Sequence, residues 1–462
     1  MSTVALQVDP AVLAEGVNLL WVLVVTFLIF FMHAGFAMLE AGQVRSKNVA
    51  NQLTKNLLTW SIGVVVFFLI GAGISSMVGS LTGGGGGYSL FGTLSAGSGG
   101  WVSWLFGAVF AMTAATIVSG AVAGRAKLRA YVTYTILLAA VIYPVVTGLT
   151  WGGGFLASVM GVGFKDFAGG MIVHGMGGIA GLTAAYMLGP RIGRYNDDGT
   201  SNVIPGHSLT FAVLGTLVLA FGWYGFNVGT QATIVTFGDA GVVFNGSALG
   251  RVALVTTLGM GGGGVAAMAV SALWQGKPDP LWTANGILAG LVGVTGAVPH
   301  VTWWGGLLIG LLVGALVLPV FRWTVDSLKI DDVCGVFAVH GAAGGIGTIL
   351  IPVVGSADGG GYEFLGVDQL IMQIVGVGVV GTWTVLATMA ALGIIGALVG
   401  LRVSEEEEEA GLDISEHGVS TYPEFGQDGG AVSADGGKEV THPDDVRTDG
   451  GSCCGSPGDS DE

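Results

Sequence analysis

Apolar residues fill most of the chain in stretches of eighteen or more, and short polar connectors separate these stretches. A helix of about twenty apolar residues spans the roughly 30 Å hydrocarbon core of a bilayer, so each stretch predicts a transmembrane helix. The pattern therefore predicts an all-α integral membrane protein. About eleven helices are expected, at residues 17–39, 57–79, 101–123, 131–152, 168–188, 207–231, 248–274, 284–299, 303–322, 334–354 and 368–400.

The composition excludes several classes of protein. Of the 462 residues, 52% are hydrophobic and 10% are charged, whereas about 25% of the residues of an ordinary globular protein are charged. A soluble enzyme, a nucleic-acid binder and a disordered chain are thereby excluded. The formal net charge of −15 belongs to the C-terminus, because residues 402–462 hold 17 of the 31 acidic residues but only three of the 16 basic ones.

The distribution of lysine and arginine predicts the orientation in the membrane. Over the connectors, two basic residues, Lys165 and Arg251, fall on one side and eleven on the other. Such an excess marks the cytoplasmic side, so the N-terminus is expected outside and the C-terminus inside. The first apolar stretch lacks a basic leader and a cleavage site and is expected to be a retained span. The eleven residues are Arg45, Lys47, Lys55, Arg125, Lys127, Arg129, Arg191, Arg194, Lys277, Arg322 and Lys329.

Two segments of the sequence resemble each other and lie five predicted helices apart. Asp166 precedes His174 by eight residues, Asp332 precedes His340 by the same interval, and each histidine stands between a valine and a glycine. A repeat unit with an odd number of crossings places its two copies in opposite orientations. The sequence therefore predicts two inverted five-helix repeats followed by a final helix, with the two histidines meeting near the middle of the membrane.

The two histidines allow more than one interpretation. A single membrane histidine is most often a hydrogen-bonded packing residue, but two at matching repeat positions favour a pore-lining, proton-handling pair, because ionisable groups at that depth are costly. A metal site would need further ligands, and Cys334 is the one candidate near His340, so no metal is expected. Asp166 and Asp332 are expected to cap helices, with a further role left open.

These residues, together with others, resemble the ammonium transporter (Amt/Rh) family over nearly the whole chain, on its Amt branch. Each stretch alone would be weakly specific, but five in the same order on one scaffold are highly specific. The similar stretches are residues 166–170 with His174, 222–227, 289–295, 331–341, and 401–418 at the start of the tail.

The resemblance also implies how the chain is divided. Residues 1–401 would form the transmembrane transporter domain, and residues 402–425 a cytoplasmic regulatory motif. Residues 426–462 are expected to be a disordered acidic tail, which is compatible with the high-salt cytoplasm of a haloarchaeon. Within this tail, the adjacent Cys453 and Cys454 leave a lipidation or metal site open.

Site residues follow from the resemblance at the positions that match the family's motifs. Because an aromatic face attracts a cation and a hydroxyl accepts one N–H, substrate recruitment would use Phe110, Trp151 and Thr230. Without the resemblance, a tryptophan of the interfacial aromatic belt is the alternative interpretation of Trp151. Phe110 and Phe226 would form a hydrophobic gate above the pore histidines. Supporting residues would be Asp166, Trp223, Thr295 and Asp332, and those of the regulatory tail Gly411, Asp413 and His417.

The function implied is ammonium transport across the cell membrane, with methylammonium as an analogue. Ammonium would be recruited at an external aromatic vestibule and deprotonated, and ammonia would pass the histidine pair with net charge movement. The alternatives are a neutral gas channel of the Rh type and an ammonium sensor. The protein is expected not to be an enzyme and to need no cofactor.

The partners implied are a homotrimer in the lipid bilayer and a PII-type signalling protein on the cytoplasmic face. The tail motif is expected to dock across that face and to couple the subunits. The basic connectors at residues 125–129 and 191–194 and at Lys329 are expected to offer both the tail and this partner an electrostatic surface.

Overall fold

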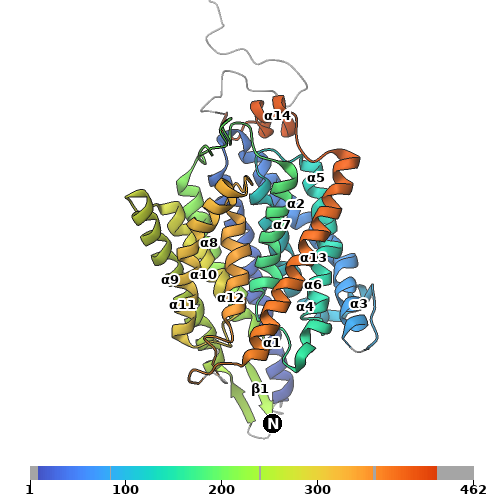
Figure 1. Cartoon of the computed structure of the whole chain (residues 1–462). Helices are drawn as coiled ribbons and strands as arrows, with labels where there is room; N and C mark the ends of the chain where they lie inside the picture. Colours follow the sequence, from blue (N-terminus) through green and yellow to red (C-terminus); the bar gives the residue numbers. More distant parts are fainter. Residues whose placement is uncertain (1–8, 84, 239–240, 357–359, 424–462) are drawn as a thin grey trace, which may run out of the picture.

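The computed structural model describes residues 9–83, 85–238, 241–356 and 360–423. Its helices run between two ends of the molecule (Figure 1). The start of α1 lies at the N-terminal end, and α14 lies at the opposite, tail end. The helices of the bundle are α1 (Pro10–Gln43), α2 (Val49–Val66), α3 (Ala72–Thr82), α4 (Gly97–Val122), α5 (Leu128–Leu137), α6 (Tyr143–Leu149), α7 (Met176–Leu188), α8 (Leu209–Thr230), α9 (Gly246–Gln275), α10 (Pro280–Thr295), α11 (Trp303–Arg322), α12 (Ala343–Leu350) and α13 (Val367–Val399).

The all-α class predicted from the sequence is confirmed. Nine helical segments within the described residues are long and apolar enough to cross a membrane, and two shorter apolar segments, Pro280–Thr295 and Phe337–Leu350, accompany them. Each predicted range overlaps one of these segments. A small antiparallel hairpin at the N-terminal end, which was not predicted from the sequence, is formed by β1 (Val235–Gly238) and β2 (Gly241–Phe244).

Local sequence signals explain where several helices begin. Asp9 accepts the backbone N–H of Ala11 at 2.9 Å. Asp279 accepts the backbone N–H of Leu281 at 2.8 Å. In both helices the next residue is a proline, which fits the first helical position because it has no N–H to satisfy.

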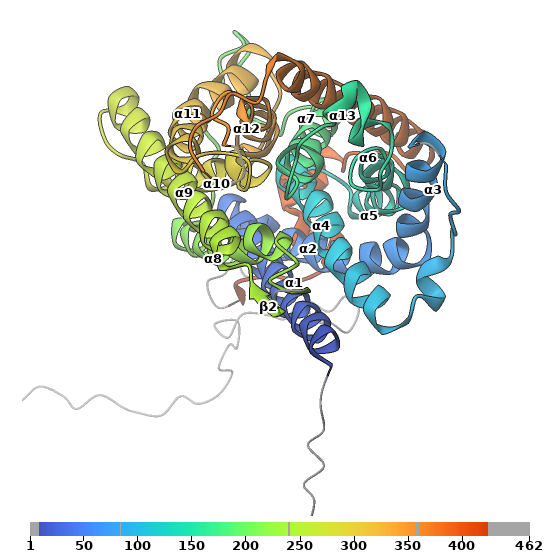
Figure 2. The same ribbon diagram turned by 90° about the horizontal axis from the view of Figure 1, so that it is seen from below.

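Glycines let α9 and α11 approach each other closely on one side of the bundle. α9 packs against α10 and α11 on one side, away from α3, α5 and α6 (Figure 2). A Cβ on Gly310 would lie 2.2 Å from the carbonyl oxygen of Gly259, and one on Gly314 would lie 2.3 Å from that of Gly263. Larger side chains at these positions would force the helices apart. Small residues instead allow the close backbone contact that stabilises helix packing in lipid.

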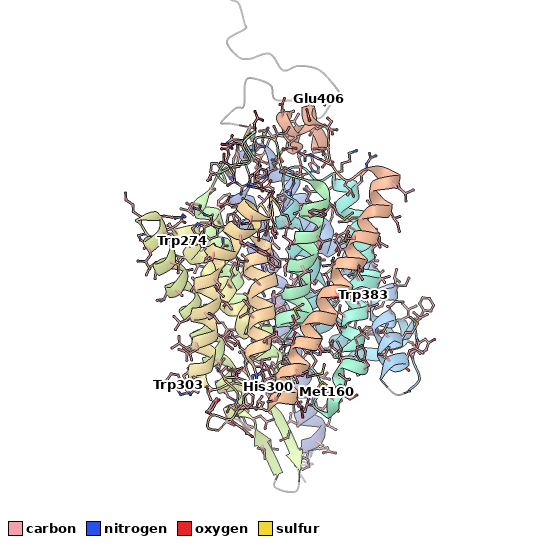
Figure 3. The ribbon with its side chains drawn as sticks, viewed as in Figure 1. Met160, Trp274, His300, Trp303, Trp383 and Glu406 are labelled. Carbon is pink, nitrogen blue, oxygen red and sulfur yellow. The ribbon has the colours of Figure 1, made fainter. Side chains whose placement is uncertain are left out.

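The surface around the bundle is apolar, as a bilayer requires. Leu20 is 61% exposed, Phe221 57% and Leu398 78%, although each lies within a long helix. The exposed tryptophans Trp274 and Trp303 lie toward opposite ends of the bundle (Figure 3). Tryptophans at both interfaces are typical of transmembrane proteins, so the chain is a multi-pass membrane protein.

Candidate functional site: a histidine pair inside the bundle

The two histidines of the sequence repeat lie against each other. His174 is on the π-helical turn η7 (Gly170–Gly175) and His340 is on η9 (Phe337–Ala342). Their Nδ1 atoms are 3.3 Å apart, and the buried rings stack with centroids 5.4 Å apart. One Nδ1 must donate and the other accept, so the donor ring keeps a lone pair on Nε2 that can receive a further proton. Among the described residues, Nε2 of His174 has no hydrogen-bond partner.

Asp166 holds the turn that carries the first histidine. Its Oδ1 accepts the backbone N–H groups of Gly169 at 2.9 Å and Gly170 at 2.7 Å. Its Oδ2 accepts those of Met171 and Ile172, both at 2.8 Å. Gly169 has a φ of 93°, a conformation that glycine adopts without strain. One carboxylate therefore satisfies the four N–H groups at the start of this helical segment.

Asp332 repeats this arrangement with fewer bonds. Its two oxygens accept the backbone N–H groups of Val336 at 2.9 Å and Phe337 at 2.8 Å. Gly335, three residues after the aspartate, has a φ of 68°, as Gly169 does at 93° in the first copy. Burial raises the pKa of Asp332 to about 6, and the two N–H groups oppose that shift. The inverted repeat thus extends from the sequence to the backbone conformation.

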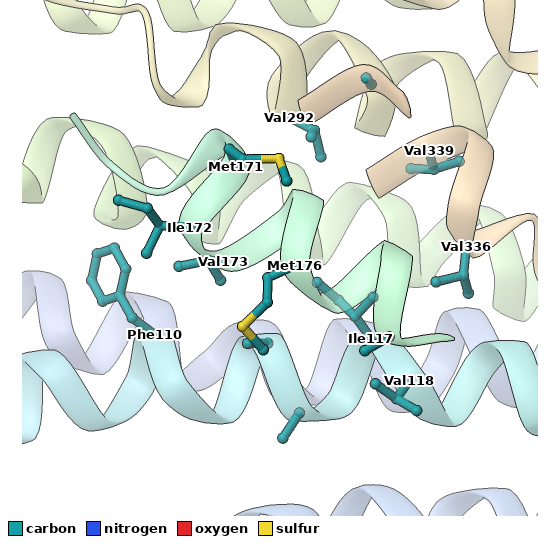
Figure 4. Packing of buried hydrophobic residues seen from close by; sticks show 14 of the residues in the cluster. Phe110, Ile117, Val118, Met171, Ile172, Val173, Met176, Val292, Val336 and Val339 are labelled. Carbon is teal, nitrogen blue, oxygen red and sulfur yellow. The ribbon is translucent and has the colours of Figure 1, made fainter. Parts of the chain in front are cut away.

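Aromatic rings cover the pair on the side toward the N-terminal end. Phe226 lies with its centroid 5.1 Å from that of His174, and Phe110 lies 4.2 Å from Phe226. Trp151, which is 43% exposed, meets Phe110 edge-on at 5.9 Å. Its Nε1 donates to the backbone oxygen of Asp166 at 2.8 Å. Rings therefore extend from a partly exposed tryptophan to the buried histidine, and Figure 4 shows Phe110 beside the turn that carries that histidine.

The remaining predicted residues lie at two different places. Trp223 stacks on His174 with centroids 4.7 Å apart, and its Nε1 donates to Oγ1 of Thr295 at 2.8 Å. Thr230 lies at the end of α8, where its hydroxyl donates to the backbone oxygen of Phe226 at 2.8 Å. No hydrogen bond or ring contact among the described residues joins this threonine to the tryptophan of the predicted recruitment site.

Two cavities lie on the side of the pair toward the tail end. A small cavity of about 20 Å³, which has room for about one water, is lined by His340, Glu40, Asn285 and Cys334. A larger cavity of about 670 Å³ shares the last two of these residues and opens among the connectors at the tail end. Glu40 was not predicted as a site residue, because the first span was expected to end at residue 39. The signal was present, since an ionisable residue beside an apolar run is a candidate for function.

Arginines of the connectors form an internal network around one aspartate. Arg191 pairs with Asp331 at 2.8 Å and Arg194 pairs with it at 3.2 Å. Arg125, which is fully buried, donates to the backbone oxygen of Asp331 at 2.7 Å. Burial alone would raise the pKa of this aspartate, but the hydrogen bonds and charge of Arg191 hold it well below its usual range.

The expectation that these connectors offer an open basic surface is therefore wrong for the three arginines. Their guanidinium groups are used to hold neighbouring connectors together, because an arginine fork can satisfy several carbonyl and carboxylate oxygens at once. Arg129 and Lys329 do keep exposed side chains.

The start of the tail folds back onto the tail end of the bundle. It forms two short helices, α14 (Glu405–Ala410) and α15 (Leu412–His417). Asp413 accepts the backbone N–H of Asn51 at 2.9 Å, and the side chain of Asn51 lies 3.1 Å from Nε2 of His417. A Cβ on Gly411, whose φ is 103°, would lie 2.7 Å from Cβ of Lys47. All three predicted tail residues thus lie against α2 or the turn before it.

The distal tail is outside the description. Residues 424–425 of the predicted motif and the acidic segment 426–462, with Cys453 and Cys454, are not among the described residues. Within the described ranges, no group of three or more His, Cys, Asp or Glu side chains is arranged to hold a metal ion.

Comparison with known sequences gives matches over nearly the whole chain. Residues 20–422 match the model of the Ammonium Transporter Family. Ammonium transporter Amt1 of Haloferax mediterranei is 60% identical over 452 residues, which are 95% of this chain and 86% of that protein. Ammonium transporter Amt2 of the same organism is 61% identical over 430 residues, 91% of this chain and 93% of that protein.

Solved structures of proteins named Amt and Mep2 are also similar to this chain. The chain named "Sensor Amt Protein" superposes with a TM-score of 0.78 at 33% identity, covering 87% of this chain and 98% of that chain. Candida albicans Mep2 superposes with a TM-score of 0.74 at 25% identity, covering 87% of this chain and 89% of that chain. The match to two long haloarchaeal relatives fits the Amt branch and a haloarchaeal origin.

Proposed function

This chain belongs to the ammonium transporter family, and from that premise we propose that it transports ammonium across the cell membrane by deprotonating it and conducting ammonia past the histidine pair. The N-terminal end is taken as the outer face, as the excess of basic residues in the opposite connectors indicates. The named relatives support transport over sensing.

The pathway begins at the partly exposed Trp151. Ammonium is held there by the aromatic face, which attracts a cation by about 0.5–2 kcal/mol, and by an oxygen acceptor such as Thr230. The proton leaves before the substrate passes Phe110 and Phe226, because the buried rings provide no group to replace the hydration shell of an ion. Ammonia then passes the histidine pair, which can hydrogen-bond it and take up the released proton.

One observation carries this proposal: two imidazoles with their Nδ1 atoms 3.3 Å apart lie between an aromatic closure and a cavity. Potassium and ammonium have nearly the same size and charge, so a cage of carbonyls would discriminate poorly between them. Only ammonium can give up a proton. A dry passage with a proton-accepting pair therefore selects ammonium by chemistry that potassium lacks.

The decisive experiment is to measure the current that ammonium induces in proteoliposomes containing the purified protein. Ammonium and methylammonium should each produce a current, whereas sodium and potassium at the same concentration should produce none. Flux of ammonia without any current, measured as a rise in internal pH, would instead support the neutral gas channel. Neither current nor flux would overturn the proposal of transport.

The assembly and regulation follow the same premise. A homotrimer is proposed from the family resemblance, and the exposed apolar residues Phe27 and Phe31 of α1 suit a contact with lipid or with a second subunit. The tail motif would couple the subunits, and a PII-type signalling protein would bind at the tail end. Native mass spectrometry in mild detergent should give three subunits per particle, and one or two would contradict the trimer.

A further inference from the structure

Glu40 is a buried carboxyl group inside the bundle. It lies in α1 near the tail end and is 3% exposed. Its Oε2 accepts Nε2 of Gln52 at 2.7 Å, Nδ2 of Asn56 at 2.7 Å and Oγ of Ser119 at 2.7 Å. No ion pair of Glu40 occurs within the described ranges. An ionisable group at such a place is costly and is typical of a proton or ion pathway.

The carboxyl group borders the pathway. It lines the small cavity together with His340 and Cys334, and this cavity adjoins the larger one at the tail end. A Cβ added to Gly120 would lie 3.2 Å from Oε1 of Glu40 and 3.3 Å from Cβ of Cys334, so this oxygen lies close to the lining. Among the described residues, the one donor near Oε1 is the Ser119 hydroxyl at 2.8 Å, whose single proton is shared with Oε2, so Oε1 keeps capacity for a further bond.

We propose that Glu40 is the proton carrier of the inner half of the pathway, where it returns a proton to ammonia that has passed His340. The proposal rests on the proposed function and adds a residue to it. The proton released by ammonium at the outer side passes from the histidine pair to the Glu40 carboxylate and forms the acid. Ammonia in the small cavity then takes this proton, which leaves the carboxylate and one ammonium ion. One ammonium and one positive charge cross in each cycle.

The groups around Glu40 suit a carboxyl that changes its charge. Lys55 of α2 is fully buried, and in the described chain its Nζ has no hydrogen-bond partner. It interacts electrostatically with Glu40, as do Tyr131 of α5 and Cys334, and His340 faces it across the small cavity. Among the described residues no ion pair to this lysine fixes the carboxyl group in its charged form, so the acid and the anion both remain accessible.

A structural role is the alternative, and Glu40→Gln separates the two. The amide oxygen of glutamine can replace Oε2 and accept the same three donors, and its NH₂ can replace Oε1 and donate to the hydroxyl of Ser119. The variant therefore keeps the packing of α1, α2 and α4 but cannot carry a proton. In proteoliposomes, the ammonium current should fall at least tenfold. Ammonia should still enter the variant but without its proton, so an ammonium gradient should raise the internal pH, whereas the wild type imports ammonia together with a proton and should raise the internal pH less.

A Glu40→Gln protein with wild-type current would overturn the proposal while leaving the proposed function intact. Loss of both current and ammonia flux in a folded variant would also overturn it, since the residue would then only hold the pore open. If the wild type itself carries no ammonium current, the proposed function fails first. The matched control is Thr59→Val, which removes a buried hydroxyl of α2 bonded to Tyr131 without touching Glu40, and its current should be unchanged.

Two variants keep the carboxyl group in case the glutamine protein does not fold. Glu40→Asp and Ser119→Ala both alter the surroundings of the acid, the second by removing the hydroxyl that the two carboxyl oxygens share. Each should keep part of the current but shift the pH at which it is half-maximal. A pH profile identical to that of the wild type in both variants would contradict proton transfer through Glu40.

Discussion

The outer and inner halves of the proposed pathway share one backbone motif, but the side chains around it differ. In each half an aspartate precedes a glycine of positive φ by three residues, and a histidine follows that glycine by five. On the outer side, His174 lies against the rings of Trp223 and Phe226. On the inner side, His340 borders a small cavity that Glu40 also lines.

This difference shows what an inverted repeat determines. The repeat sets the position and direction of each histidine, because the backbone around it is duplicated. It does not set the neighbours, because each copy faces the opposite end of the bundle and meets different helices there. The outer half is therefore suited to excluding hydrated ions and the inner half to handling a proton. Variants that affect one half of the pathway more than the other test this difference.

Replacing both pore histidines should have the largest effect. His174→Leu with His340→Leu removes both imidazoles of the proposed proton-accepting pair, so the ammonium current should fall to the background of empty liposomes. His33→Leu is the matched control, since it removes a buried histidine of α1 that has no hydrogen-bond partner in the described chain. The oligomeric state should be the same in both variants as in the wild type. Normal current in the double variant would mean that the two histidines only fill space in the core.

The two aspartates should differ in their contribution to stability. Asp166→Asn weakens a cap of four N–H bonds and should lower the free energy of unfolding by about 2–4 kcal/mol, because hydrogen bonds to charged groups contribute about 1.5–3 kcal/mol each. Asp332→Asn weakens only two such bonds and should cost about 1 kcal/mol or less. Thermal unfolding in detergent at pH 7 measures both. Equal losses would contradict the asymmetry.

The pH dependence sharpens this test for the inner aspartate. Burial raises the pKa of Asp332 to about 6, from an ordinary value of 3.8. The stability from this group is therefore complete below about pH 4 and is lost as the pH rises through 6. Asp332→Asn stays neutral throughout, so between pH 5 and pH 8 it should gain roughly 1 kcal/mol relative to the wild type. A difference in the free energy of unfolding that stays constant with pH would show that the pKa of this carboxyl group is not raised.

Substitutions of Trp151 affect only the outer half of the proposed pathway. Trp151→Leu removes the aromatic face and should raise the ammonium concentration for half-maximal current by roughly 5- to 30-fold, which corresponds to a cation–π interaction of about 1–2 kcal/mol. Trp151→Phe keeps a ring but loses the bond to the backbone of Asp166, so it separates recruitment from support. Loss confined to saturating ammonium would contradict a recruiting role.

The tail should have the smallest effect, and only through the inner half. Deleting residues 404–462 removes the contacts of Asp413 and His417 with Asn51, one turn of α2 before Lys55, and should lower the current by about two- to fivefold. The protein should remain in the membrane, and its binding of a PII-type protein should change. Deleting only residues 424–462 is the control, because it keeps both tail helices and should leave the current unchanged. Equal behaviour of the two truncations would make the whole tail a solvated segment.

Much of the molecule is encoded in patterns that are local or periodic in the sequence. The spans follow from the length of each apolar run, since the thickness of the bilayer sets how long a helix must be. The repeated spacing of Asp166 to His174 and of Asp332 to His340 already placed the two histidines in corresponding copies. The caps at Asp166 and Asp332 followed from residue type, because an aspartate before a helix has free N–H groups to accept.

The tertiary structure decided where the charged residues at the ends of spans lie. Glu40, one residue beyond the predicted end of its span, is enclosed by donors from α2 and α4, and Arg125 and Arg191 turn inward to Asp331 and its backbone. Hydropathy assigns all of them to water, because a single sequence records the cost of burying a charge but not the partners that offset it. Those partners come from segments as far as 206 residues away. Whether an ionisable side chain is exposed or lines a pathway is therefore a property of the assembled bundle.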